Sequence, residues 1–168
     1  AVETAMAKVV TVVGSMEGAN WDAENYDYRL QHQGSGVYTG EITVTDEANG
    51  YGSFVIYTRK AEGEEANIYS GPSAGYELYE GVTDKCGLYT EGFTWKVEAG
   101  TYLVTLDLKN RTIRINDPSA PDVNQGRAYA ALAAAIRKTE AEWPLIDLSA
   151  LKAILADENS TDEQMEAA

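Results

Sequence analysis

Hydrophobic and polar positions alternate with a period of two along most of the first 116 residues. In one stretch Phe54 and Ile56 share a face while Tyr57 and Arg59 take the other, and the segment 102–108 is apolar at every second position. This period places neighbouring side chains on opposite faces of a β-strand. The pattern therefore predicts strands at 9–13, 28–31, 37–44, 53–59, 67–69, 93–97, 101–108 and 111–116.

The first of these segments is the most distinctive. Residues 9–13 are all Val or Thr, which favours a buried strand, and Gly14 and Gly18 then allow a tight turn. Trp21 follows directly, and we expect its large apolar ring to close the core as a lid rather than to contact a ligand.

Short strands with no helix between them indicate an antiparallel β-sandwich. Lys109-Asn110 is predicted to join the last two strands as a two-residue hairpin, with Asn110 in the left-handed conformation. The segment 60–92 is less regular, and a connection of this length is usually functional or locally mobile.

The composition changes near Pro118. Residues 1–116 hold ten of the eleven tyrosines, whereas 124–168 are rich in Ala, Leu and Glu. The Pro-containing stretch 117–123 between them is typical of a linker. We therefore expect two domains, a β-sandwich at 1–116 and a helical segment at 124–168.

The helical segment is expected to be a small helical hairpin or partial three-helix bundle. In the first helix, apolar residues recur at helical spacing at Tyr129, Leu132, Ile136 and Trp143, before Pro144 ends it. Asp147-Leu148-Ser149 offers caps for a second helix with Leu151, Ile154 and Leu155, and a capping box at 160–163 opens a third that is truncated.

Charge and composition exclude several functions. The chain has 168 residues, 44% of them hydrophobic, and 13 basic against 27 acidic residues give a net charge of −14. Such a surface repels nucleic acid and anionic lipid, whereas a neutral ligand is compatible with it. No stretch resembles a membrane span or a signal peptide. Both ends look cut, so we expect a piece of a longer protein.

No motif for catalysis is found. The single cysteine, Cys86, is expected to be a half-buried core residue, and His32 lies in a polar strand or turn, so a Cys-His site is not indicated. The acidic loop 62–65 is typical of a solvated surface, and 157–159 lacks the ligand spacing of a calcium loop. We expect no enzyme activity, no cofactor and no metal, with a weak surface cation site left open.

Aromatic residues on polar strands are the most informative feature. Sugars offer apolar C–H faces and a rim of hydroxyls, which aromatic stacking and hydrogen bonds recognise together, and each aromatic contact contributes about 0.5–1.5 kcal/mol. The predicted carbohydrate-binding platform is Tyr57, Tyr69 and Trp95, with Arg59 and Lys60 as polar partners. The alternative is that these rings simply cover a half-buried strand face.

Five short motifs occur along the β-rich part of the chain: Val-Val-Gly-Ser-x-x-Gly-x-x-Trp at 12–21, Gly-Val-Tyr-x-Gly at 36–40, Gly-x-Phe-x-Ile at 52–56, Gly-Thr-Tyr-x-Val-Thr-Leu-Asp at 100–107 and Thr-Ile at 112–113. With these motifs, residues 8–116 resemble the starch-binding modules of SusE/SusF-type outer-membrane lipoproteins, which belong to polysaccharide-utilisation systems of Bacteroidetes. The resemblance implies an immunoglobulin-like sandwich that binds glucans through aromatic platforms without cleaving them.

The tail contains Ala-Leu-x-x-Ala-Ile at 131–136, Ile-Asp-Leu-Ser-Ala-Leu at 146–151 and Asp-Glu-Asn-Ser-Thr-x-Glu-Gln-Met-Glu-Ala-Ala at 157–168. With these motifs it is similar to the FIVAR-type helical repeat, a spacer in bacterial surface and secreted proteins. Both resemblances imply a location at the cell surface, anchored to the outer membrane in the full-length protein.

Together these observations predict a non-catalytic surface module that binds a neutral glycan such as starch or another glucan. Its other partners would be domains or proteins of a surface glycan-uptake complex, with no nucleic acid and no membrane insertion by this segment. The alternative is a structural spacer of a larger surface protein, with no ligand of its own. The two hypotheses differ in whether the aromatic rings converge in the open or are spread through the core.

Overall fold

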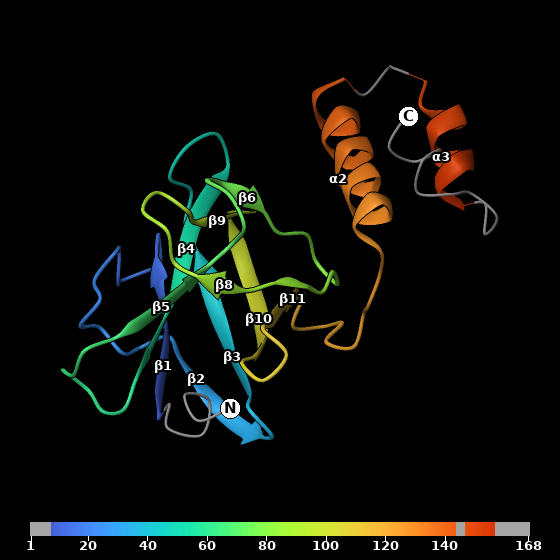
Figure 1. The fold of residues 1–168 in the computed structure, drawn as a ribbon. Helices are drawn as coiled ribbons and strands as arrows, with labels where there is room; N and C mark the ends of the chain where they lie inside the picture. Colours follow the sequence, from blue (N-terminus) through green and yellow to red (C-terminus); the bar gives the residue numbers. More distant parts are fainter. Residues whose placement is uncertain (1–7, 144–146, 157–168) are drawn as a thin grey trace. The chain divides into compact units, whose positions relative to one another are not determined.

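The computed structural model describes residues 8–143 and 147–156. The chain divides into two compact units, Ala1–Val123 and Asn124–Ala168 (Figure 1). The strands of the first unit are β1 (Val9–Gly14), β2 (Arg29–Gly34), β3 (Val37–Val44), β4 (Tyr51–Arg59), β5 (Asn67–Ser70), β6 (Tyr76–Glu77), β7 (Asp84–Lys85), β8 (Gly87–Leu88), β9 (Trp95–Glu98), β10 (Gly100–Asp107) and β11 (Thr112–Asn116). The second unit contains α2 (Arg127–Glu142) and α3 (Ser149–Ala156).

The first unit is mainly β, as the alternating pattern predicts, and each of the eight predicted strands forms with its ends shifted by up to three residues. Three further strands of two residues each, β6, β7 and β8, lie in the stretch 60–92, where the polar sequence gives no alternation. This stretch is therefore partly ordered by pairing with the main strands rather than by its own sequence.

The strands form one curled sheet in the order β6-β9-β4-β1-β2-β3-β10-β11-β7, with β5 and β8 joined to it through β4. Pairing is antiparallel except between β6 and β9, which run parallel. β2 is the strand at which the sheet turns. Its Leu30 pairs with Val10 of β1, whereas its His32 pairs with Tyr38 of β3. β2 thus joins two series of strands into one sheet: β6, β9, β4 and β1 on one side of it, and β3, β10, β11 and β7 on the other.

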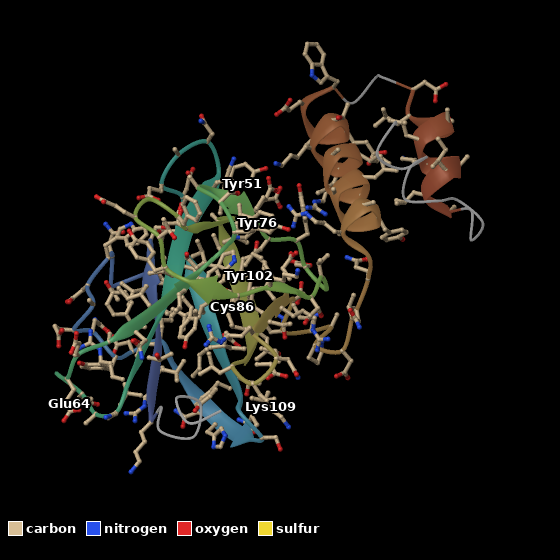
Figure 2. The ribbon with its side chains drawn as sticks, viewed as in Figure 1. Tyr51, Glu64, Tyr76, Cys86, Tyr102 and Lys109 are labelled. Atoms are coloured by element: carbon tan, nitrogen blue, oxygen red, sulfur yellow. The ribbon has the colours of Figure 1, made fainter. Side chains whose placement is uncertain are left out.

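The core of the β unit is one hydrophobic cluster, and strands of both series contribute side chains to it. Its largest fully buried side chains include Trp95, Tyr69, Phe54, Met16 and Ile42. Figure 2 shows the labelled Cys86 and Tyr102 in the interior of the β unit and Glu64 and Lys109 at its periphery. Each large apolar side chain removed from water contributes about 1.5–3 kcal/mol, so this cluster is the main stabilising element of the unit.

Two turns of the β unit contain left-handed backbone positions. Between β3 and β4, Asn49 and Gly50 have φ of 55° and 86°, as a type I′ turn requires. Between β10 and β11 the predicted two-residue loop is wrong: Asp107 pairs with Thr112, so residues 108–111 form a four-residue loop, and Arg111, with φ of 56°, takes the left-handed position instead of Asn110. Asn110 instead forms hydrogen bonds within the loop: its backbone N–H and its side-chain amide both donate to the carboxylate of Asp107.

The segment 117–123 packs back on the β unit. The buried side chain of Asn116 donates from Nδ2 to the carbonyl oxygens of Ala120, at 3.4 Å, and Val123, at 2.8 Å. One amide at the end of β11 thereby fixes the path of the chain up to the boundary between the units.

The second unit is a helical pair with its own small core. Leu132 and Ile136 of α2 pack with Leu148, and residues of α3 complete the cluster. The buried apolar face of α2 is shorter than predicted, because Tyr129 is 37% and Trp143 64% exposed. Trp143 is the C-cap residue, and its backbone no longer follows the helical periodicity. Just before α3, the carboxylate of Asp147 accepts the backbone N–H of Ser149, the first residue of the helix, at 2.9 Å. The predicted third helix lies outside the described residues.

Neither α2 nor any other helix in the described part of the chain has the length and apolarity needed to cross a membrane.

Candidate functional site

The predicted aromatic platform does not form. Trp95 and Tyr69 are 0% and 1% exposed and belong to the core. The strand register explains this, because Trp95 pairs with Phe54 and Tyr69 pairs with Ile56, and cross-strand partners share a face. Tyr57, one position along from Ile56, lies on the opposite face. These three rings therefore cannot stack on one ligand, and Trp95 and Tyr69 cannot be reached by any.

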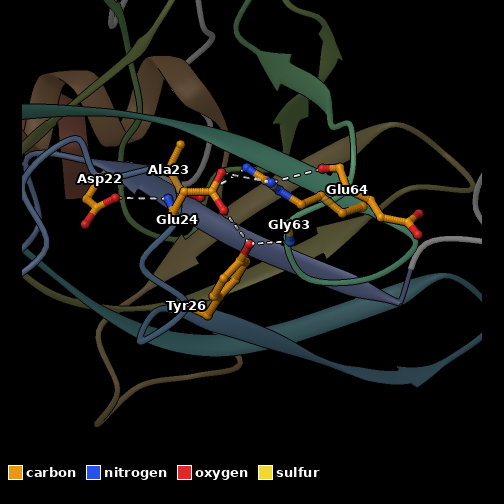
Figure 3. A network of polar contacts seen from close by, with 7 residues as sticks. Asp22, Ala23, Glu24, Tyr26, Gly63 and Glu64 are labelled. Atoms are coloured by element: carbon orange, nitrogen blue, oxygen red, sulfur yellow. Dashed lines mark hydrogen bonds and ion pairs between the residues drawn. The ribbon is translucent and has the colours of Figure 1, made fainter.

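Arg59, predicted to contact sugar hydroxyls, is a buried structural residue. Its side chain is 5% exposed and donates hydrogen bonds to the carboxylate of Glu24 at 3.2 Å, to the carbonyl oxygen of Ala23 at 3.1 Å and to the carbonyl oxygen of Glu64 at 3.0 Å. The guanidinium group thus joins two connections, β1–β2 and β4–β5, across the end of β4 (Figure 3). The predicted role is wrong because this face of the sheet is covered.

Two tyrosines complete the surroundings of Arg59. The guanidinium carbon lies 5.8 Å from the ring centroid of Tyr26 and 5.5 Å from that of Tyr57, within the range of cation–π attraction. The hydroxyl of Tyr26 donates to Glu24 at 3.0 Å and accepts the N–H of Gly63 at 2.8 Å (Figure 3). Tyr57 is therefore half-buried beside a cation. Of the five predicted binding residues, only Lys60 is exposed.

Trp21 is, like Tyr89, an aromatic side chain that the structure places at the surface of the β unit. The prediction that it closes the core is wrong, because it is 40% exposed. Its backbone N–H donates to the carbonyl oxygen of Gly14 at 2.6 Å, and its indole Nε1–H donates to the Glu47 carboxylate at 3.1 Å. Both ends of the residue are thereby held, and the ring is presented in one orientation.

The loop that carries Trp21 is anchored at several points. Met16 and Ala19 are buried in the core, so the segment between β1 and Trp21 is held from inside. Gly14 permits the close approach this needs, since a Cβ atom there would lie 2.1 Å from the carbonyl oxygen of Ser53. The loop is therefore a rigid support rather than a mobile excursion.

The backbone of Trp21 is in the left-handed region, with φ of 55°. For a bulky residue this conformation costs about 1–2 kcal/mol. Complete burial of the ring would offset that cost, but two fifths of the residue stay exposed. Strained positions of this kind are concentrated at functional sites, and an observed outlier supports a functional hypothesis.

The thiol of Cys86 and the possible metal ligands are the other candidate reactive groups that the sequence raises. Burial raises the pKa of the Cys86 thiol to about 12, although the nearby positive charge of Arg111 lowers it somewhat. A thiol with this pKa is protonated at neutral pH and is a poor nucleophile. The expectation of a core cysteine is confirmed, and the side chain is 2% exposed. Within residues 8–143 and 147–156, no three acidic, His or Cys side chains gather as metal ligands.

Comparison of the chain with protein-family models, with curated proteins and with solved structures found no match.

Proposed function

We propose that the β unit is a non-catalytic surface module that binds a neutral glycan, with Trp21 as its stacking residue in place of the buried Tyr69 and Trp95. The observation that carries this proposal is the rigid presentation of an exposed indole at a left-handed backbone position. A net charge of −14 disfavours anionic ligands and leaves neutral ones unaffected.

The proposal extends to the fold and the setting of the module. The two series of strands joined at β2 would be the two sheets of an immunoglobulin-like β-sandwich. The resemblance to SusE/SusF-type modules favours a longer outer-membrane lipoprotein at the cell surface, with other glycan-uptake domains or proteins as partners. The α2–α3 pair would serve as a partial FIVAR-like spacer.

Affinity electrophoresis in gels cast with soluble α- or β-glucans tests this function. The proteins to compare are the parent, Trp21→Ala and Tyr89→Ala. Tyr89 is a matched control because it is also 40% exposed and its hydroxyl accepts the N–H of Gly92 at 3.2 Å. We expect a glucan to retard the parent and Tyr89→Ala, and Trp21→Ala to migrate as it does without glycan.

The second candidate function is a structural spacer with no ligand. It is favoured by one specific observation: of the three aromatic residues predicted to form a platform, two lie in the core and Tyr57 lies beside Arg59. If no neutral glycan retards the parent, the glycan hypothesis is refuted and the spacer role replaces it. If both alanine variants are retarded as the parent is, the module binds glycan elsewhere than at Trp21.

A further inference from the structure

Glu47 shares a hydrogen bond with the exposed indole and is itself fixed by a tight turn. Its backbone N–H donates to the carbonyl oxygen of Tyr51 at 2.8 Å, and the intervening Asn49 and Gly50 both have positive φ. The carboxylate of Asp46 accepts the N–H of Gly50 at 2.9 Å, which closes the turn from its other side. Glu47 therefore projects from a rigid hairpin toward a rigid loop.

The position of this carboxylate decides which part of Trp21 a ligand can use. The indole N–H is the only polar atom of the ring, and it is engaged by Oε1 of Glu47. A ligand is left with the apolar ring face, and a sugar stacked there would place its hydroxyl rim near the Glu47 carboxylate. Hydroxyl groups can donate to a carboxylate, whereas an anionic group there would meet like charge.

Neighbouring residues strengthen this selection. Asp46 and Asp22, adjacent in sequence to Glu47 and Trp21, are both exposed. A second or third negative charge raises the repulsion of any carboxylate or sulfate brought to the ring, and leaves an uncharged ring unaffected.

We propose that Glu47 is the positioning and specificity-determining residue of the Trp21 site: it fixes the indole for stacking and favours uncharged sugars over uronates and sulfated sugars. This inference rests on the proposed glycan-binding function. It assigns two separable roles to one side chain, since the hydrogen bond needs an acceptor and the preference for uncharged sugars needs a charge.

Two substitutions separate these roles. Glu47→Gln keeps an oxygen that accepts the indole N–H but removes the charge, and Glu47→Ala removes both. Glu41→Gln is the control for charge alone, because Glu41 is exposed on β3, six residues from Glu47. At about 3.3 Å per residue along the strand, Glu41 lies roughly 10 Å from Val44, where β3 ends before the turn that carries Glu47, which is more than the screening length of about 8 Å at physiological salt.

The measurement is retardation in gels cast with the neutral glucan that retards the parent, or with polygalacturonate, relative to gels without glycan. On the neutral glucan we expect Glu47→Gln to bind as the parent does and Glu47→Ala to bind more weakly. On polygalacturonate we expect Glu47→Gln to bind roughly two- to fivefold more tightly than Glu41→Gln, the effect of one exposed charge pair.

Each outcome bears on a distinct claim. If the neutral glucan fails to retard the parent, the proposed function is refuted together with this inference. If the parent is retarded but Glu47→Gln and Glu47→Ala bind the neutral glucan equally, Glu47 does not position the ring. If Glu47→Gln gains no more polygalacturonate binding than Glu41→Gln, its charge does not set specificity, and glycan binding itself stands.

Discussion

Arg59 offers the sharpest test of how the β unit is held together. It is the buried side chain through which the β1–β2 and β4–β5 connections are joined, so replacing it with Met removes the guanidinium while retaining most of the aliphatic stem. The variant keeps the aliphatic packing of the stem and loses the charge, its hydrogen bonds and its cation–π contacts with Tyr26 and Tyr57.

The expected loss of stability can be estimated from the hydrogen-bond partners of Arg59. Two hydrogen bonds from a charged donor to the carbonyl oxygens of Ala23 and Glu64 are worth about 1–1.5 kcal/mol each, at the low end because both acceptors lie near solvent. The pair with Glu24, whose side chain is 65% exposed, adds less than about 1 kcal/mol. We therefore expect Arg59→Met to lower the free energy of unfolding by about 2–4 kcal/mol.

Urea denaturation measures this value. With a slope of about 2 kcal/mol per molar urea, the midpoint should fall by about 1–2 M while the slope itself stays unchanged. Arg29→Met is the matched control, because Arg29 pairs with Glu62 at 3.3 Å on a surface where the two side chains are 37% and 59% exposed. We expect that control to cost under about 1 kcal/mol. Equal losses in the two variants would refute the structural role assigned to Arg59.

Three further predictions concern the core. Gly14→Ala should destabilise the β unit by about 2 kcal/mol or more in the same urea assay, because its Cβ would lie 2.6 Å from the Cα of Phe54, whereas Gly87→Ala, with nothing within 4 Å, should be neutral. The Cys86 thiol should react with a thiol reagent at pH 8 only after unfolding, and reaction at the same rate in native and urea-unfolded protein would contradict its burial. Since burial raises its folded pKa from 9.0 to about 12, its contribution to stability should be complete below pH 9 and decline as pH rises toward 12.

The strands could be predicted from the sequence because alternation is a local property. The segments 37–44 and 53–59 carry the pattern strongly, and their ends fall at or near those of β3 and β4. The strands β6, β7 and β8 could not be predicted, because each has two residues and exists only through pairing with a distant strand. The Arg111 turn was missed because Asp107 engages Asn110, a contact that residue preference alone does not reveal.

The site was harder to predict because it depends on register and on which faces are covered. The pairing of Ile56 with Tyr69 decides that Tyr69 points inward, and no local pattern specifies that pairing. The burial of Arg59 had a weak signal in the sequence: β1 is apolar at consecutive positions, and Val9 and Val13 are buried outside the main core cluster. A strand that is apolar on both faces must be covered by other residues on both faces. Arg59 pairs with Val9 and so lies on the second of these covered faces.

The two tryptophans of the β unit illustrate what separates a core aromatic residue from a candidate ligand contact. Trp95 sits in regular strand backbone, 0% exposed, with its ring 5.4 Å from that of Phe54, so its conformation is accounted for by packing. Trp21 sits in left-handed backbone with its ring partly in water and its one polar atom held by Glu47. Burial of the ring in the core does not account for that arrangement. A structure that holds a strained, exposed ring in one orientation favours a role outside the fold, and this is the physical reason to test Trp21 and Glu47 before any other surface of the molecule.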